Sequence, residues 1–234
     1  FGPLDVVPFA AGRVTAYDGD FDTFSADSNS MRLWAMGGVR LHAEAGRTFE
    51  SVDVRWLDLH RLRHVIEPGL DFGYAESNVS SDDYPVYDTN VEDIREGSTV
   101  RVALRNTLQT QRGGPGRWRT VDWIVINTDA VFTGNDVDVA TPVARHISYR
   151  PEFSTGGDHF YSDVMWMISD TLAAVAEINY NMEDEGLALW RFGSTLQHTP
   201  RLSLFVDFAE IDVLRSRLLT YGFDYELSRK YRAG

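Results

Sequence analysis

Hydrophobic and polar side chains alternate with a period of two along most of the chain, and the alternation is clearest in the last third. This period is typical of a β-strand with unlike faces. Short connections such as Thr199-Pro200 separate consecutive runs, as in an antiparallel meander. The pattern predicts about eleven strands, at Val6–Tyr17, Leu33–Ala45, Leu62–Ala75, Val100–Gln111, Trp118–Phe132, Ala144–Phe153, Phe160–Ile168, Leu172–Tyr180, Leu187–His198, Leu202–Phe208 and Leu219–Leu227. The run Val121–Ile126 is apolar on both faces, so the pattern does not say which of its residues lie on the hydrophobic side of the sheet.

The predicted strands belong to one β unit that covers residues 1–234. No exact internal repeat and no linker interrupts the chain, and helical periodicity is scarce. The sequence begins at Phe1 without a methionine or a signal-like segment. We therefore interpret it as a piece excised from a longer precursor, and the lack of a targeting signal says nothing about location.

The length of the predicted strands favours a transmembrane β-barrel, of which this chain forms part of the wall. The strands run to about 9–13 residues, whereas soluble sheets most often use about 5 or 6 and membrane strands need about 9–11. Lys230 is the only lysine. Aromatic residues lie near strand ends, at Tyr17, Tyr74, Trp118, Phe132, Phe160, Tyr180 and Tyr225, and glycines lie inside strands, at Gly37, Gly38, Gly69, Gly73, Gly193 and Gly222. A soluble β-sandwich would show the same alternation, so that alternative stays open.

A proline interrupts the two-faced segment LRHVIEPGLDFGYAES, Leu62–Ser77. Pro68 has no N–H to donate to a neighbouring strand. Lipid cannot satisfy a carbonyl that loses its donor. We therefore predict a distorted or missing ladder bond at Pro68 on the side of one neighbour.

Composition and charge exclude several classes. The formal net charge of −13 argues against nucleic acid as a partner, because nucleic-acid binding needs a basic surface. The absence of cysteine excludes disulfides, a thiol nucleophile and a thiolate metal site. A hydrophobic content of 43% and an aromatic content of 12% argue against disorder.

Two arrangements resemble metal sites, and neither predicts one. His60 and His64, near Glu67, would share a face on a helix, but on a strand they spread over about 13 Å. We expect belt or surface histidines there.

The acidic segment near residue 20 copies the start of a calcium-binding loop. Asp18, Asp20 and Asp22 have the first spacing, but Thr23 and Asn29 stand where Gly and Glu are expected. We expect a solvated acidic loop, with loose binding of divalent cations as a hypothesis.

No catalytic or cofactor-binding residue is predicted. Gly113–Gly116 is glycine-rich but lacks the features of a phosphate cradle, so it predicts a hairpin turn. A grouping such as Asp158, His159 and Ser162 arises by chance in a chain with this many Ser and Asp residues.

Charged residues recur on the polar side of the predicted strands and are candidates to line a lumen. In barrels such residues mostly hydrate the interior or pair across strands. The candidate lumen-lining residues are Arg63, Glu67, Asp71, Arg101, Arg105, Glu177, Arg191, Asp207, Asp224 and Glu226.

Two segments carry a family resemblance: HVIEPGLDFGY at His64–Tyr74 and VEDIREGSTVRVALRNTLQTQRGG at Val91–Gly114. With the later two-faced strands from Ser162 to Tyr231, they resemble the barrel domain of the LPS-assembly protein family. This family is the outer-membrane lipopolysaccharide translocon of Gram-negative bacteria, also called the organic solvent tolerance protein. The family's barrel has many more strands, its periplasmic jelly-roll is not recognisable here, and its cysteines are absent. Disulfide-controlled assembly is therefore in doubt for this chain.

The resemblance implies a non-enzymatic transport protein of the cell outer membrane. The cargo would be lipopolysaccharide or another amphiphile, and outer-membrane lipids would surround the barrel. A small plug lipoprotein and periplasmic bridge proteins are the implied partners. The alternatives are a soluble or surface β-sandwich that binds carbohydrate, and a barrel phospholipase.

Overall fold

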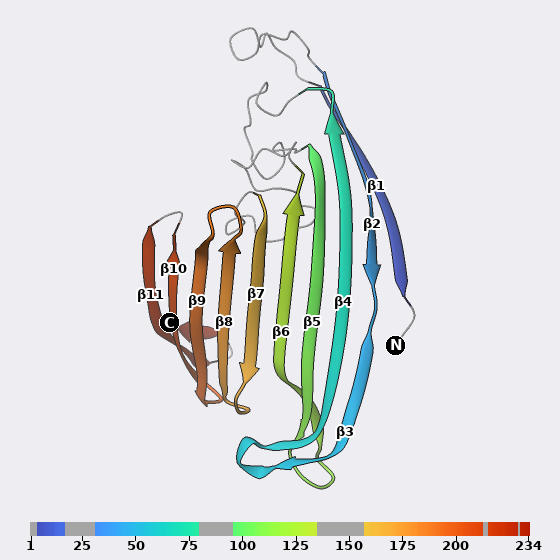
Figure 1. Cartoon of the computed structure of the whole chain (residues 1–234). Helices are drawn as coiled ribbons and strands as arrows, with labels where there is room; N and C mark the ends of the chain where they lie inside the picture. Colours follow the sequence, from blue (N-terminus) through green and yellow to red (C-terminus); the bar gives the residue numbers. More distant parts are fainter. Residues whose placement is uncertain (1–3, 17–30, 80–95, 135–156, 213–214, 229) are drawn as a thin grey trace.

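The computed structural model describes residues 4–16, 31–79, 96–134, 157–212, 215–228 and 230–234, and these form one curved β-sheet (Figure 1). The strands are β1 (Asp5–Ala16), β2 (Met31–His42), β3 (Ala45–Val54), β4 (Leu59–Ser77), β5 (Gly97–Arg112), β6 (Arg119–Thr133), β7 (His159–Met167), β8 (Leu172–Asn181), β9 (Gly186–Thr199), β10 (Leu202–Ile211), β11 (Ser216–Ser228) and β12 (Tyr231–Ala233). A short 3₁₀ turn, η1 (Arg55–Leu57), joins β3 to β4. Among these described residues no helix is long and apolar enough to cross a membrane.

The sheet is an antiparallel meander, which confirms the predicted all-β class. Its order is β1-β2-β4-β5-β6-β7-β8-β9-β10-β11-β12, and β3 also pairs with β4, beyond the end of β2. Ten of the eleven predicted strands correspond to observed ones, and Ala144–Phe153 lies outside the described residues. The sequence pattern missed β3 and the three-residue β12.

The short turns between β5 and β6, β7 and β8, and β9 and β10 lie at one end of the sheet, the lower end in Figure 1. The predicted hairpin at Gly113–Gly116 is confirmed there. Gly113 and Gly116 have φ values of 118° and 77°, and the backbone N–H of Arg117 donates to the carbonyl of Gly114 over 2.8 Å. Glycine adopts these positive φ angles without the steric cost that a side chain brings.

The pairing register gives the sheet two unlike faces. Residues directly opposite each other on antiparallel strands lie on the same face of the sheet. The pairing register therefore assigns every strand residue to one of the two faces. We call the side with Glu67, Asp71 and Arg101 the polar face, and the side with Leu70, Phe72 and Leu104 the apolar face. The apolar face continues through Phe132, Trp166, Ile178, Trp190, Phe192, Leu204, Val206, Leu219, Tyr221, Phe223 and Tyr225.

Burial is inverted relative to a soluble sheet. Every apolar-face residue just named from Leu70 to Tyr225 is an exposed large hydrophobic. The polar face holds buried polar side chains, among them Glu177 at 7%, Asn179 at 3% and Asp129 at 8% exposure, together with small and medium hydrophobic ones such as Val65 and Val125. The described strands belong to this one sheet, so no second layer of strands covers the apolar face.

A β-bulge explains why the facing of Val121–Ile126 could not be read from its sequence. Leu108 pairs with Ile124, but Gln109 pairs with Asp122, so Trp123 is the extra residue on β6. A bulge changes the alternation of faces by one residue. Before Trp123 the odd-numbered residues lie on the apolar face, and after Trp123 the even-numbered residues do. The apolar run therefore has no constant alternation.

The predicted disruption at Pro68 is confirmed on one side of β4. The pairing of β2 with β4 ends at His42 and Gly69, and the pairing of β3 starts at Ala45 and Ile66, so Pro68 lies opposite the break between β2 and β3. The Pro68 carbonyl still accepts the N–H of Ala43 over 3.1 Å. On the other side the β4–β5 register passes through Pro68 and Leu104 without a shift. The missing N–H therefore falls where regular pairing has already stopped.

The adjacent glycines Gly37 and Gly38 differ in how closely they are packed. A Cβ on Gly38 would overlap the carbonyl oxygen of Phe72 and lie 2.5 Å from Cζ of Phe9. A Cβ on Gly37 would meet only the carbonyl oxygen of Phe9, at 3.8 Å. Phe9 thus covers a glycine on the neighbouring strand, a packing that only the absence of a side chain allows.

Replacing Gly38 with alanine is expected to lower the free energy of unfolding by about 1–3 kcal/mol, because a backbone oxygen cannot move aside as a flexible side chain does. Gly37→Ala is the matched control and is expected to be near neutral. Urea titrations in detergent micelles measure both. Equal stabilities of the two variants would contradict the close approach at Gly38.

Candidate functional site

The ten candidate lumen-lining residues all lie on the polar face, and the structure brings most of them into contact with a partner. The three neighbouring strands β8, β9 and β10 carry the group Glu177, Arg191 and Asp207. Arg191 reaches Asp207 with Nε at 2.7 Å and Glu177 with a terminal nitrogen at 3.9 Å. Asp224 and Glu226 continue the face on β11. That this face lines a lumen remains a prediction.

Arg101 is the centre of a second group. Its terminal nitrogens lie 2.9 Å from Asp71 Oδ2 and 3.0 Å from Asp129 Oδ1. These three residues come from β5, β4 and β6, so one guanidinium ties three neighbouring strands together. Charge-assisted pairs of this kind are the stronger hydrogen bonds in proteins.

A row of polar side chains crosses six strands, and we call it the central row. Its members face one another in succession by register: Glu67, Arg105, Asn127, Asp163, Glu177 and Arg191. Asn127 donates from Nδ2 to Asp163 Oδ2 over 3.0 Å, and Arg105 Nε lies 3.5 Å from Glu67 Oε2. Asp163 and Glu177 are like charges directly opposite each other, an arrangement that costs stability when it has no compensation.

A hollow of about 690 Å³ opens on the polar face beside Arg105, between β1 and β6. Its lining includes the small residues Gly69 and Ala103, which face each other on β4 and β5. Its remaining polar lining comes from Asp5, Arg40, His42, Glu67, Asp71, Arg101, Arg105, Asn127, Thr128 and Asp129. Charged and amide side chains along the lining suit a polar or ionic group.

Sequence reasoning missed several residues of this site. Asp5, Arg40, His42, Asn127, Asp129 and Asp163 were not among the candidates. Their strands were predicted, so extending the alternation to every polar position on each strand would have found Arg40 and Asp163. Asn127 and Asp129 could not be assigned to a face, because Trp123 shifts the phase of β6.

The other candidate groupings do not assemble. His60 lies 3.1 Å from Asp53 and 3.5 Å from Asp58, whereas His64 lies on the apolar face, 3.2 Å from Asn106. The described part of the chain contains no group of three or more potential metal ligands. The acidic segment with Asp18, Asp20 and Asp22 lies outside the described residues.

Asp158, His159 and Ser162 also stay apart. Ser162 Oγ contacts the backbone and side chain of the neighbouring strand on the apolar face, at Asn127 O and Thr128 Oγ1. His159 lies on the polar face, and its Nδ1 is 3.1 Å from the carbonyl of Gly157. A serine and a histidine on opposite faces of one strand cannot form a nucleophile–base pair.

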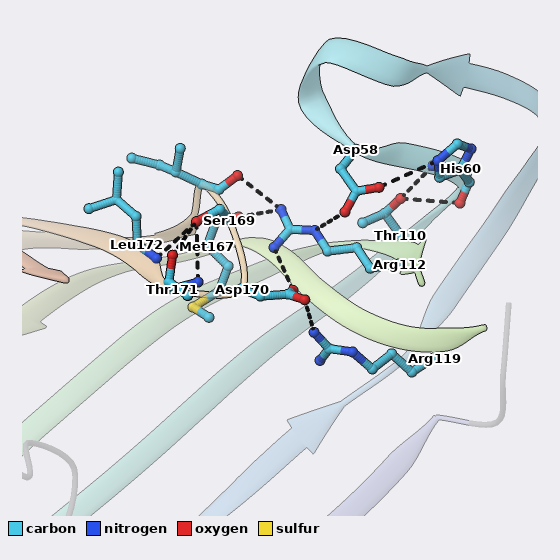
Figure 2. Close-up of polar contacts among 11 residues, drawn as sticks. Asp58, His60, Thr110, Arg112, Arg119, Met167, Ser169, Asp170, Thr171 and Leu172 are labelled. Atoms are coloured by element: carbon cyan, nitrogen blue, oxygen red, sulfur yellow. Dashed lines mark hydrogen bonds and ion pairs between the residues drawn. The ribbon is translucent and has the colours of Figure 1, made fainter. Parts of the chain in front are cut away.

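A buried arginine joins three turns at the lower end of the sheet (Figure 2). The side chain of Arg112 is fully buried. One terminal nitrogen donates to the carbonyls of Met167 and Ile168 over 2.7 and 3.1 Å. The guanidinium also reaches Asp170 at 3.4 Å and Asp58 at 3.7 Å. Strand ends that are far apart in sequence are thereby fixed to one another.

Asp170 is shared between Arg112 and Arg119 in this turn cluster. Arg119 lies 2.5 Å from Asp170 Oδ2, on the opposite carboxylate oxygen from Arg112 (Figure 2). Burial acts to raise the pKa of Asp170, but hydrogen bonds and Coulombic attraction from Arg119, and then from Arg112, outweigh it. The pKa of Asp170 therefore lies below its ordinary value of 3.8.

This lowered pKa predicts a pH-dependent contribution to stability. A carboxylate with a depressed folded-state pKa stabilises the fold above its unfolded pKa, and the contribution disappears as the pH falls through the folded value. Asp170→Asn should therefore lower stability at neutral pH, with the difference from the original protein shrinking below about pH 4. Urea midpoints of both proteins across pH 2–7, in micelles, measure it. A difference that stays constant over this range would contradict the assignment.

Comparison of the sequence with known proteins gives no relative for these features. No protein-family model matches the sequence, and no curated protein matches it.

Proposed function

We propose that this chain forms part of the wall of a transmembrane β-barrel in the outer membrane. The observation that carries the proposal is the contrast between the two faces of the single sheet, with large hydrophobic side chains exposed on one face and the charged side chains, some of them buried as Glu177 and Asp129 are, gathered on the other. Outer-membrane barrels alternate apolar residues toward lipid with polar residues toward the interior. In water, an apolar face of this extent would be covered by a second layer.

Side chains at the upper end of the apolar face support this placement. Trp190 Nε1 donates to Glu210 Oε2 over 3.1 Å, and Arg217 Nε donates to Glu210 Oε1 over 2.9 Å. A tryptophan with its ring among apolar neighbours and its N–H bound to a charged group is suited to the membrane–water interface. Phe132, Phe160 and Tyr180 lie near the same ends of β6, β7 and β8.

We further propose that the barrel transports an amphiphile to the outer leaflet, with lipopolysaccharide as the cargo that the family resemblance implies. The polar face supports this by offering charged and amide side chains to a sugar or phosphate head group. The apolar face leaves acyl chains in contact with lipid. A plug lipoprotein and periplasmic bridge proteins stay predictions from the resemblance.

The alternatives have less support. A sandwich needs a second sheet, and all described strands belong to one. A phospholipase needs a nucleophile and base on one face, and Ser162 and His159 lie on opposite faces.

Tryptophan quenching tests the membrane placement. One variant keeps Trp166, on the apolar face, as its only tryptophan, and a matched variant keeps Trp34, on the polar face. In vesicles with brominated acyl chains, we expect strong quenching of Trp166 and little quenching of Trp34. The folded protein should also migrate faster in gels before heating than after. Equal quenching of both tryptophans, or full solubility without detergent, would refute the proposal.

A further inference from the structure

The charges of the polar face are divided between its two halves. On β1–β5 the face carries the arginines Arg13, Arg32, Arg40, Arg63, Arg101 and Arg105 against the carboxylates Asp5, Asp53, Glu67 and Asp71. The strand β6, between the two halves, adds Asp122 and Asp129. On β7–β11 it carries Asp163, Glu177, Asp207, Asp224 and Glu226 against a single arginine, Arg191. Separated charges of this kind create a field directed along the face, from the arginine half to the carboxylate half.

The central row crosses the boundary between these halves, and Arg105 is its cation on one side. The Arg105 side chain is 51% exposed. Its polar contacts, to Glu67 and Thr107, both use Nε and are both 3.5 Å long. Within the described strands its two terminal nitrogens therefore stay open to a ligand, and the hollow beside Arg105 provides the space.

Asp163 is the anion on the other side of the row. Asn127, between Arg105 and Asp163, donates to Asp163 Oδ2 and so holds that carboxylate in place. Oδ1 of Asp163 has no polar contact among the described residues. Two strand spacings separate the backbones of Arg105 and Asp163, about 10 Å. Their side chains can extend toward each other over Asn127. Arg105 can then bind the anionic group of a ligand and Asp163 its cationic group.

We propose that the central row binds a zwitterionic head group, with the anionic group at Arg105 and the cationic group at Asp163. A zwitterion satisfies both sites at once and aligns with the field between the two halves, whereas a simple anion is repelled by the carboxylates of β7–β11. This inference deepens the proposed function, because it names the head-group chemistry that the barrel's interior would select.

Calorimetric titration of the protein in non-ionic micelles tests the inference, with phosphocholine, inorganic phosphate and choline as probes. We expect phosphocholine to bind at least about tenfold more tightly than either phosphate or choline, because it makes both charge-assisted contacts. Arg105→Gln should weaken phosphocholine and phosphate binding, and Asp163→Asn should weaken phosphocholine and choline binding. Arg217→Gln, an exposed arginine on the apolar face, is the matched control and should change none of these affinities.

Phosphate binding as tight as phosphocholine binding would overturn the inference in favour of an anion site. So would the absence of phosphocholine binding, or binding that both variants leave unchanged. Circular dichroism and heat-modifiable migration establish that each variant is folded. The titration needs no lipid bilayer, so its result is independent of the quenching test. If phosphocholine does not bind but Trp166 is quenched by the brominated lipid, the ligand is refuted and the barrel is not. A protein soluble without detergent refutes the barrel and leaves the binding result standing.

Discussion

Replacing Arg112 with methionine is expected to lower the free energy of unfolding by about 3 kcal/mol, because its buried guanidinium makes charge-assisted hydrogen bonds to two backbone carbonyls, each worth about 1.5–3 kcal/mol. The side chain of Arg112 is fully buried, and its loss leaves the carbonyls of Met167 and Ile168 without that donor. Asp58 and Asp170 also lose a cation, although Asp170 keeps Arg119. Methionine fills much of the volume, so the expected loss reflects polar contacts more than a cavity.

Urea titration in detergent micelles measures this effect. Arg117→Met is the matched control, because Arg117 lies in the same β5–β6 connection and is exposed. It should change stability by less than about 0.5 kcal/mol, as surface substitutions usually do. Equal effects of the two substitutions would show that Arg112 does not tie the turns together.

The second large effect is expected on the apolar face. Val206→Arg places a charge on β10 at an apolar position that is 46% exposed. On a lipid-facing strand near the bilayer midplane, arginine costs about 2–4 kcal/mol. On a solvated surface the same substitution would be close to neutral, so the variant separates the two environments.

Thr220→Arg, on the adjacent strand β11, is the control. Thr220 lies on the polar face directly opposite Asp207, so the new cation meets a carboxylate. We expect no loss of stability there. The comparison is made by urea titration in lipid vesicles. If Val206→Arg were as stable as Thr220→Arg, the apolar face would not lie against lipid.

The sequence was a good guide wherever alternation ran unbroken. The phase of Leu62–Ala75 placed Glu67 and Asp71 on one face and Leu70 and Phe72 on the other, and the β4–β5 register confirms this. The same reasoning placed Arg191 and Asp207 on one face, because the pairing of β9 with β10 runs without a shift from Leu189 to Gln197. Strand class and facing follow from local pattern, because a strand's two environments repeat every second residue.

Other features depended on information that local pattern does not hold. The strand β3 has no clear alternation in AGRTFESVDV, because it pairs on one side only and is partly exposed on both faces. The cluster around Arg112 joins residues 58, 112 and 170, which become neighbours only after three turns meet. The break opposite Pro68 was predictable from the missing N–H, but the division of the partner strand into β2 and β3 was not.

The pairing order of the sheet also bears on how it can be assembled. Apart from β3, each strand pairs only with the strands that come before and after it in the chain. Pairing between consecutive strands closes shorter loops than pairing between distant ones, and this favours fast folding of the sheet. The sheet can therefore lengthen sideways one hairpin at a time, with the newest strand always serving as the template for the next.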